Sequence, residues 1–136
     1  MTFFVDACFG ISIKQHLIDM GLEAIHHDEL FVQGTPDTDW IPVVAAREWL
    51  VLTRDRNIFK HRLTLQAVRE GPLKFFAIGS GQADLPTLAK VVKNNIGSIA
   101  ALALHMPPPF VATLTLQDLK FKWLGDSPIT PQQSVL

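Results

Sequence analysis

Short apolar segments alternate along this chain with longer segments of helical periodicity, and this alternation limits the folds that are open to it. The apolar segments are expected to be strands. They cover residues 3–6, 23–27, 49–53, 74–79 and 110–116. Helices are expected at residues 11–20, 35–48, 63–70 and 85–104. Strands that alternate with helices predict a three-layer α/β/α sandwich around a mainly parallel sheet of about four or five strands.

The predicted helix boundaries depend on residues that start or break helices. Thr35 before Pro36 is a good helix start, with Thr35 as the cap and Pro36 in the first helical position. Asp84 is expected to cap the last helix, and the prolines at positions 107–109 are expected to end it. A single long helix is therefore predicted from Leu85 to about Leu104. Residues 119–124 are assigned to no element.

Length and composition predict one domain. At 136 residues the chain can bury a core without disulfides, and its hydrophobic fraction of 48% and mean hydropathy of +0.22 agree with this. Residues 1–124 are expected to form the domain, and residues 125–136 a flexible tail.

No apolar run reaches the ~18–20 residues of a membrane span. The N-terminus lacks a basic signal-peptide region and Cys8 has no disulfide partner, so a cytoplasmic location is expected.

The charges are distributed unevenly, although the net charge of −1 does not itself suggest a nucleic-acid binder. Residues 1–39 hold one base against seven acids, whereas residues 40–74 hold seven bases against three acids. The bases that crowd together in this second part are Arg47, Arg54, Arg56, Lys60 and Arg62. A basic patch beside an acidic cluster fits an enzyme that holds a metal and contacts phosphates. A solvated helix face explains the same charges equally well.

Acidic residues occur where the predicted elements would bring them together. Asp6 ends the first strand, Asp55 follows the third, and Asp37 and Asp39 open the second helix. The carboxyl ends of parallel strands meet at one edge of the sheet, and the second helix begins at that same edge. Carboxylates that converge in this way repel one another, and such a cluster is usually tolerated because it holds a hard cation such as Mg²⁺. The sequence therefore predicts a metal site at this edge.

Each acid also has a plainer explanation. Asp6 could cap the turn that follows the strand, and Asp55 could be an ordinary turn residue. Asp37 and Asp39 would interact favourably with the helix dipole in a first helical turn. Residues two apart do not share one helix face, so we expect only one of these two carboxylates to reach a metal. The choice between Asp37 and Asp39 stays open at this point.

Other residues that suggest chemistry have simpler interpretations. Trp40 could stack on a nucleic-acid base, but a core aromatic within the helix is favoured. His26 and His27 would point to opposite faces of a strand, so one metal cannot easily bind both, and we expect them at the surface or facing a loop. Cys8 is interpreted as a small buried thiol rather than as a nucleophile.

Four segments in order carry a resemblance to a known family. They are Phe4-Val5-Asp6, residues 21–28, Thr35-Pro36-Asp37-Thr38-Asp39-Trp40-Ile41 and Val51-Leu52-Thr53-Arg54-Asp55-Arg56. Over roughly residues 3–111 the chain resembles the PIN-like nuclease superfamily. It is most similar to the compact PIN-like proteins that act as VapC-type toxins in bacterial toxin–antitoxin pairs. Each motif is short, and their ordered combination makes the resemblance specific.

The resemblance implies an Mg²⁺- or Mn²⁺-dependent ribonuclease that a cognate antitoxin inhibits. The catalytic residues carried over are Asp6, Asp37, Asp39 and Asp55. Asp6, Asp39 and Asp55 would bind the metal, and Asp37 would be a ligand or a base. The residues expected to hold the RNA backbone are Arg54, Arg56, Lys60 and Arg62, and those expected to support the site are Thr53 and Asn57. Related sequences often have a further acid where this chain has Asn57.

Two rival functions remain at this stage. A receiver-like phosphoacceptor domain also has acids after its first and third strands, but this chain lacks a paired acid beside Asp6 and a lysine at the end of the fifth strand. A PIN-like fold that has lost catalysis and only binds a partner is favoured slightly by Asn57. In addition, a homodimer is expected if an apolar helix near residues 96–106 is exposed.

Overall fold

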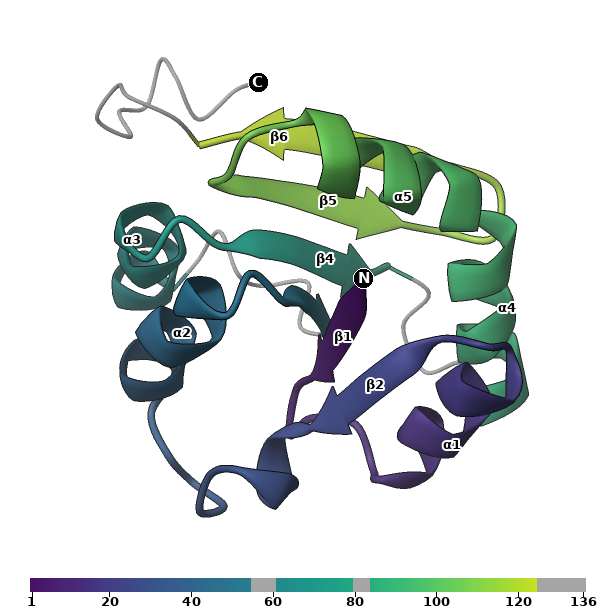
Figure 1. The fold of residues 1–136 in the computed structure, drawn as a ribbon, viewed down its shortest axis with the longest axis horizontal. Helices are drawn as coiled ribbons and strands as arrows, with labels where there is room; N and C mark the ends of the chain where they lie inside the picture. Colours follow the sequence, from purple (N-terminus) through teal and green to yellow (C-terminus); the bar gives the residue numbers. More distant parts are fainter. Residues whose placement is uncertain (55–60, 80–83, 125–136) are drawn as a thin grey trace.

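The chain folds around one six-stranded sheet with the strand order β2-β1-β3-β4-β5-β6. The computed structural model describes residues 1–54, 61–79 and 84–124. The strands are β1 (Thr2–Val5), β2 (Glu23–His26), β3 (Leu50–Thr53), β4 (Lys74–Ile78), β5 (Phe110–Leu114) and β6 (Leu119–Trp123). The first five are parallel and β6 is antiparallel to β5 (Figure 1). The tail expected at residues 125–136 lies outside the described residues.

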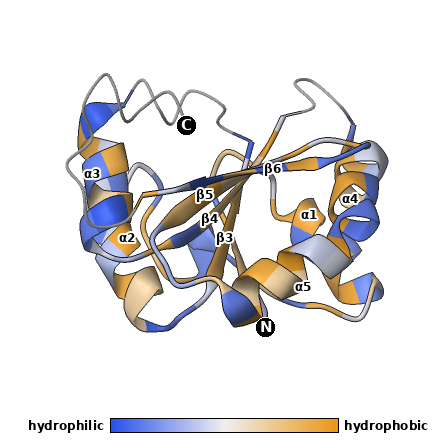
Figure 2. Ribbon diagram, turned by 90° about the horizontal axis from the view of Figure 1, so that it is seen from above, coloured by the Kyte–Doolittle hydropathy of each residue, from blue (hydrophilic) through white to orange (hydrophobic). Residues whose placement is uncertain are grey.

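Helices cover both faces of the sheet, which confirms the predicted α/β/α sandwich. One face carries α1 (Ser12–Asp19), α4 (Leu85–Asn94) and α5 (Ile96–His105), and the other carries α2 (Asp37–Ala46) and α3 (Arg62–Glu70) (Figure 2). A short 3₁₀ helix, η1 (His27–Glu29), follows β2. No helix within the described residues is long and apolar enough to cross a membrane.

The side chains of each strand alternate between two hydrophobic cores. Phe3 and Val5 of β1 pack on the α1 side, whereas Phe4 packs on the α2 side against Trp40. In β3, Leu50 and Leu52 join the first core and Val51 joins the second. By this alternation, Asp6 and Thr53 belong to the α2 side of the sheet. Because the side chains of a strand alternate between the two faces, the predicted site lies on the face that α2 and α3 cover.

The sheet has one strand more than the sequence pattern predicted. Residues 119–123 form β6, which pairs with β5 and is the last strand on that side of the sheet. Leu119 packs against the core, and Phe121 and Trp123 in alternate positions are 38% and 43% exposed. The pattern was hard to interpret because none of the three apolar side chains of β6 is fully buried.

The single long helix predicted from Leu85 is wrong, because the segment forms two helices that meet at Asn95. The cap at Asp84 is confirmed, since its carboxylate accepts the Thr87 N–H at 2.9 Å. Asn95 is buried, and its Nδ2 donates to the carbonyl oxygens of Val91 and Thr115, each at 2.8 Å. This amide ties the helix break to the end of β5, and α5 turns to lie along β5 and β6 (Figure 1).

We expect Asn95→Ala to lower the free energy of unfolding by about 1–3 kcal/mol, since it leaves a buried carbonyl without its donor. Urea unfolding followed by circular dichroism would measure the change. Asn94→Ala is a matched control, because Asn94 is exposed and donates to the Leu116 carbonyl at 3.3 Å. Equal effects of the two variants would contradict the structural role of Asn95.

The start of α2 also differs from the prediction. The N-cap residue is Pro36, and α2 begins at Asp37 rather than at Pro36. The Thr35 hydroxyl donates instead to the carbonyl of Val32 in the preceding turn. Thr35 is therefore not the cap, because its hydroxyl is used to close the loop that leads into the helix.

Candidate active site

Asp6 is held at the carboxyl end of β1, next to the end of β3. Its backbone N–H donates to the Leu52 carbonyl at 3.0 Å, which extends the pairing of the two strands by one residue. The carboxylate accepts the Ala7 N–H at Oδ1 (2.7 Å) and the Thr53 hydroxyl at Oδ2 (2.8 Å). Thr53 is fully buried. These two hydrogen bonds, one to each oxygen, fix the orientation of the carboxylate at the edge of the sheet.

Asp37 is held in a similar way at the start of α2. The indole Nε1 of Trp40 donates to Asp37 Oδ1 at 3.1 Å, and the hydroxyl of Thr64 in α3 lies 3.4 Å from Oδ2. Both helices begin at the carboxyl edge of the sheet, because each connects parallel strands. Asp37 therefore lies at the junction of α2 and α3, on the same side of the sheet as Asp6.

Asp39 has different surroundings, although only one residue separates it from Asp37. It is exposed, and no side chain within the described residues donates a hydrogen bond to its carboxylate. The contacts with Trp40 and Thr64 go to Asp37 alone. Of the two acids that open α2, the first is the one that the fold orients.

The predicted basic residues are only partly described. Arg54 directly follows β3, and its guanidinium carbon lies 5.7 Å from the centre of the Phe9 ring. Arg62 is the first residue of α3 and is exposed. The predicted site residues that lie outside the described residues are Asp55, Arg56, Asn57 and Lys60. Arg54 and Arg62 border this segment on its two sides.

The oriented carboxylates suit a hard cation by their chemistry. Mg²⁺ binds through oxygen ligands, commonly one or two carboxylates, and keeps several waters. Asp6 and Asp37 supply such oxygens, each oriented by a protein N–H and a threonine hydroxyl. Within residues 1–54, 61–79 and 84–124, no three His, Cys, Asp or Glu side chains form a group that could hold a metal. The predicted ligand set includes Asp55, which lies outside those ranges.

Cys8 lies beside Asp6 and is exposed, so its predicted burial is wrong. Its Sγ nevertheless faces the protein, 3.3 Å from Thr53 Oγ1 and 3.6 Å from Asp6 Oδ2. Desolvation of the thiol, together with the charge of Asp6, raises the pKa of Cys8 to about 11. The thiol is therefore protonated at neutral pH, which makes it a poor nucleophile, as expected.

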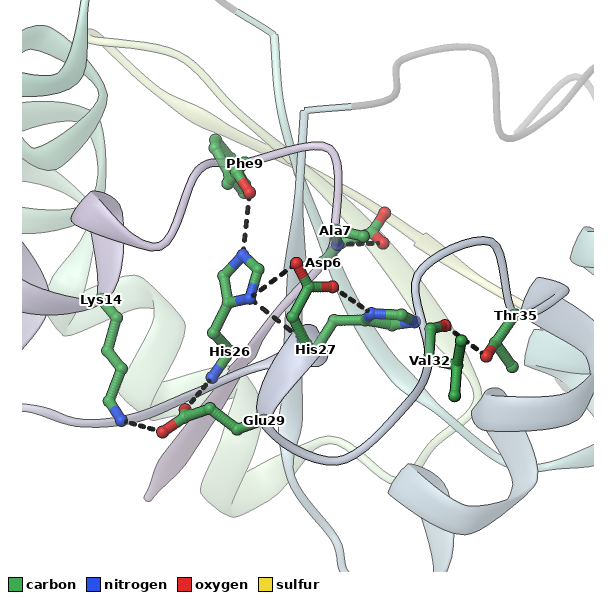
Figure 3. A network of polar contacts seen from close by, with 10 residues as sticks. Asp6, Ala7, Phe9, Lys14, His26, His27, Glu29, Val32 and Thr35 are labelled. Carbon is green, nitrogen blue, oxygen red and sulfur yellow. Dashed lines mark hydrogen bonds and ion pairs between the residues drawn. The ribbon is translucent and has the colours of Figure 1, made fainter.

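His26 and His27 do not lie at the surface, since each is only 1% exposed, but the other placement expected for them, facing a loop, holds for His26. The Asp28 N–H donates to His26 Nδ1 at 3.1 Å, so Nε2 carries the hydrogen and donates to the Phe9 carbonyl at 2.8 Å (Figure 3). This bond ties the end of β2 to the loop that follows Asp6. The predicted opposite orientation of the two rings holds, because His27 packs against Phe4 on the α2 side.

The loop after β2 is held by a charged pair that the sequence analysis did not identify. Glu29 accepts the His26 N–H at 2.7 Å and the Lys14 ammonium at 2.6 Å (Figure 3). Together with the His26 ring, Glu29 forms a capping box around η1. A Glu three residues after the last strand residue was the available signal, although such boxes are usually recognised from Ser or Thr at the first position.

Comparison with known proteins agrees with the fold. A family model described as PIN like domain matches residues 1–80, which is more than half of the 136 residues. The chain therefore belongs to the PIN-like domain family. PIN-like domains are usually nucleases, so the family indicates a hydrolase of the nuclease type. The match spans β1 to β4 and includes all four predicted acids. No curated protein and no solved structure matches the chain.

Proposed function

We propose that this protein is a divalent-metal-dependent endoribonuclease whose active site lies at the carboxyl edge of β1 and β3. The observation that carries the proposal is the shared arrangement of Asp6 and Asp37. Each carboxylate accepts a hydrogen bond from an N–H and one from a threonine hydroxyl, on the same side of the same edge. Carboxylates oriented in this way are expected of metal ligands, because such partners fix ligand orientation.

The residues of the site would have different roles in phosphodiester hydrolysis. Asp6 and Asp55 would hold Mg²⁺ or Mn²⁺, with Asp37 as a third ligand or as the base. When bound there, the cation would lower the pKa of a bound water and stabilise the charge that develops on the phosphoryl group. Thr53 would keep Asp6 in position, and Asn57 would contribute hydrogen bonds without charge.

The RNA backbone would lie along the basic residues beside the acids. Arg54 follows β3 and Arg62 begins α3, so both residues lie at the carboxyl edge of the sheet, as the two proposed acids do. Arg56 and Lys60 belong to the intervening segment of the sequence. Such contacts position a nucleic acid without reading its sequence. We therefore expect cleavage to weaken as the salt concentration rises.

The biological role that we propose is that of a cytoplasmic toxin controlled by a cognate antitoxin. The resemblance to VapC-type proteins motivates this part of the proposal. A homodimer is proposed on a separate observation, the exposure of α5. Ile99 is the buried residue of this apolar helix, and Leu104 is 78% exposed.

Purified protein, free of any antitoxin, is expected to cleave single-stranded RNA when Mg²⁺ or Mn²⁺ is added and to stop when EDTA is added. Gel electrophoresis of an end-labelled RNA would follow the reaction. A DNA strand of the same sequence is the control for substrate class. Intact RNA at every metal concentration would contradict the proposal and would favour a PIN-like module that only binds a partner.

A further inference from the structure

Trp40 is a buried tryptophan whose polar atom contacts an acid of the proposed site. Its side chain is 1% exposed, so it cannot stack on a bound base. Its indole N–H donates to Asp37 Oδ1 at 3.1 Å. We propose that Trp40 is a positioning residue that holds the Asp37 carboxylate in the orientation needed to bind the metal. This inference rests on the proposed function, because it assigns Asp37 a place at the metal.

The indole ring is itself held firmly. The ring centres of Trp40 and Phe4 lie 5.1 Å apart, and that of His27 lies 6.0 Å from Trp40 in an edge-on arrangement. Phe4 belongs to β1, two residues before Asp6, and His27 begins η1. The direction of the indole N–H is therefore set by the sheet and by η1, and Asp37 Oδ1 is held relative to both.

The second oxygen of Asp37 is contacted from another element. The hydroxyl of Thr64 in α3 lies 3.4 Å from Oδ2, so the carboxylate is held between its own helix and the neighbouring one. Asp37 and Trp40 are three residues apart and lie on one face of α2. Asp39 lies off this face, and the indole therefore selects the first acid of the helix over the second.

Mn²⁺ binding, measured by calorimetry, separates positioning from simple packing. Trp40→Phe removes the N–H and keeps an aromatic ring against Phe4. We expect its Mn²⁺ affinity to fall by about 10- to 100-fold, as for other groups that hold metal ligands. Trp49→Phe is the matched control, because the Trp49 ring also lies against Phe4, at 6.2 Å, but it contacts Arg47. Its Mn²⁺ affinity should equal that of the wild type.

A second replacement removes the donor without changing the volume of the core. Benzothienylalanine at position 40 has sulfur in place of the indole N–H, so it keeps the packing even if Trp40→Phe unfolds the protein. It should reproduce the loss of affinity. In an Asp37→Asn background, replacing Trp40 should cause no further loss, because its effect passes through Asp37.

The possible results distinguish this inference from the proposed function. If the wild type binds Mn²⁺ and the benzothienylalanine variant binds it equally well, Trp40 only packs and the inference is overturned. The inference would also be overturned if replacing Trp40 lowered the Mn²⁺ affinity as much in the Asp37→Asn background as in the wild type. Trp40 would then affect metal binding without acting through Asp37. A wild type that binds no Mn²⁺ would overturn both the inference and the proposed function.

Discussion

Asp6→Asn is expected to slow RNA cleavage by about 100-fold or more while the protein remains folded. A bound metal stabilises the transition state by several kcal/mol, and a loss of about 3 kcal/mol corresponds to about 100-fold in rate. Asn is nearly the same size as Asp but carries no charge for a cation. The Thr53 hydroxyl, which donates to Asp6 at 2.8 Å, can rotate to accept from an amide instead.

Single-turnover cleavage with saturating Mn²⁺ would measure the effect of Asp6→Asn. Thermal unfolding by circular dichroism is the control, and the melting temperature should change by no more than a few degrees. Glu23→Gln provides a matched charge control. Glu23 is the first residue of β2, so it lies at the edge of the sheet opposite to Asp6, and it accepts a hydrogen bond from the Thr2 hydroxyl at 2.8 Å. Cleavage by Asp6→Asn at more than half of the wild-type rate would show that this carboxylate is not part of the active site.

Asp37→Asn and Asp39→Asn are expected to differ strongly, although they change neighbouring acids of one helical turn. We expect Asp37→Asn to reduce cleavage by about 100-fold, by the same argument as for Asp6. Asp39→Asn should reduce it by less than about threefold, because an exposed charge that is screened by solvent contributes little. Asp37 is oriented by Trp40 and Thr64, whereas Asp39 is exposed.

This pair of variants tests the assignment directly, because the two substitutions remove the same charge from the same helix end. Both weaken the interaction with the helix dipole to a similar extent, so a loss of dipole stabilisation alone would affect the two proteins equally. The resemblance to VapC-type proteins placed Asp39 among the metal ligands. A large loss in Asp39→Asn with little loss in Asp37→Asn would support that assignment and would contradict the one favoured by the geometry.

The sequence pattern predicted most of the sheet, because each buried strand is a short run of apolar residues that can be recognised without knowing its neighbours. Phe3, Phe4 and Val5 are all fully buried, and they supply both cores in turn. The break in the last helix was not predictable in this way. It depends on Asn95 bonding to the carbonyl of Thr115, which is 20 residues further along the chain.

In the candidate site, too, some features follow from the local sequence, and others depend on contacts between residues far apart in the chain. The position of Asp6 follows from the end of a strand, which the sequence displays. The preference for Asp37 over Asp39 depends on Thr64, 27 residues away, and on a buried indole. The burial of His26 depends on a hydrogen bond to the Phe9 carbonyl, 17 residues earlier. Sequence patterns identified which acids could take part, and the packing of α2 against β1 and α3 distinguishes between them.

A crystal structure of the protein soaked in Mn²⁺, with anomalous scattering measured from the metal, would test the central claim most directly. We expect an anomalous peak at the carboxyl edge of β1 and β3, with Asp6 and Asp37 oxygens as ligands and Asp55 beside them. Asp39 should lie away from the metal. A map with no peak at this edge, or with a peak bound by Asp39 and not by Asp37, would contradict the proposed metal site.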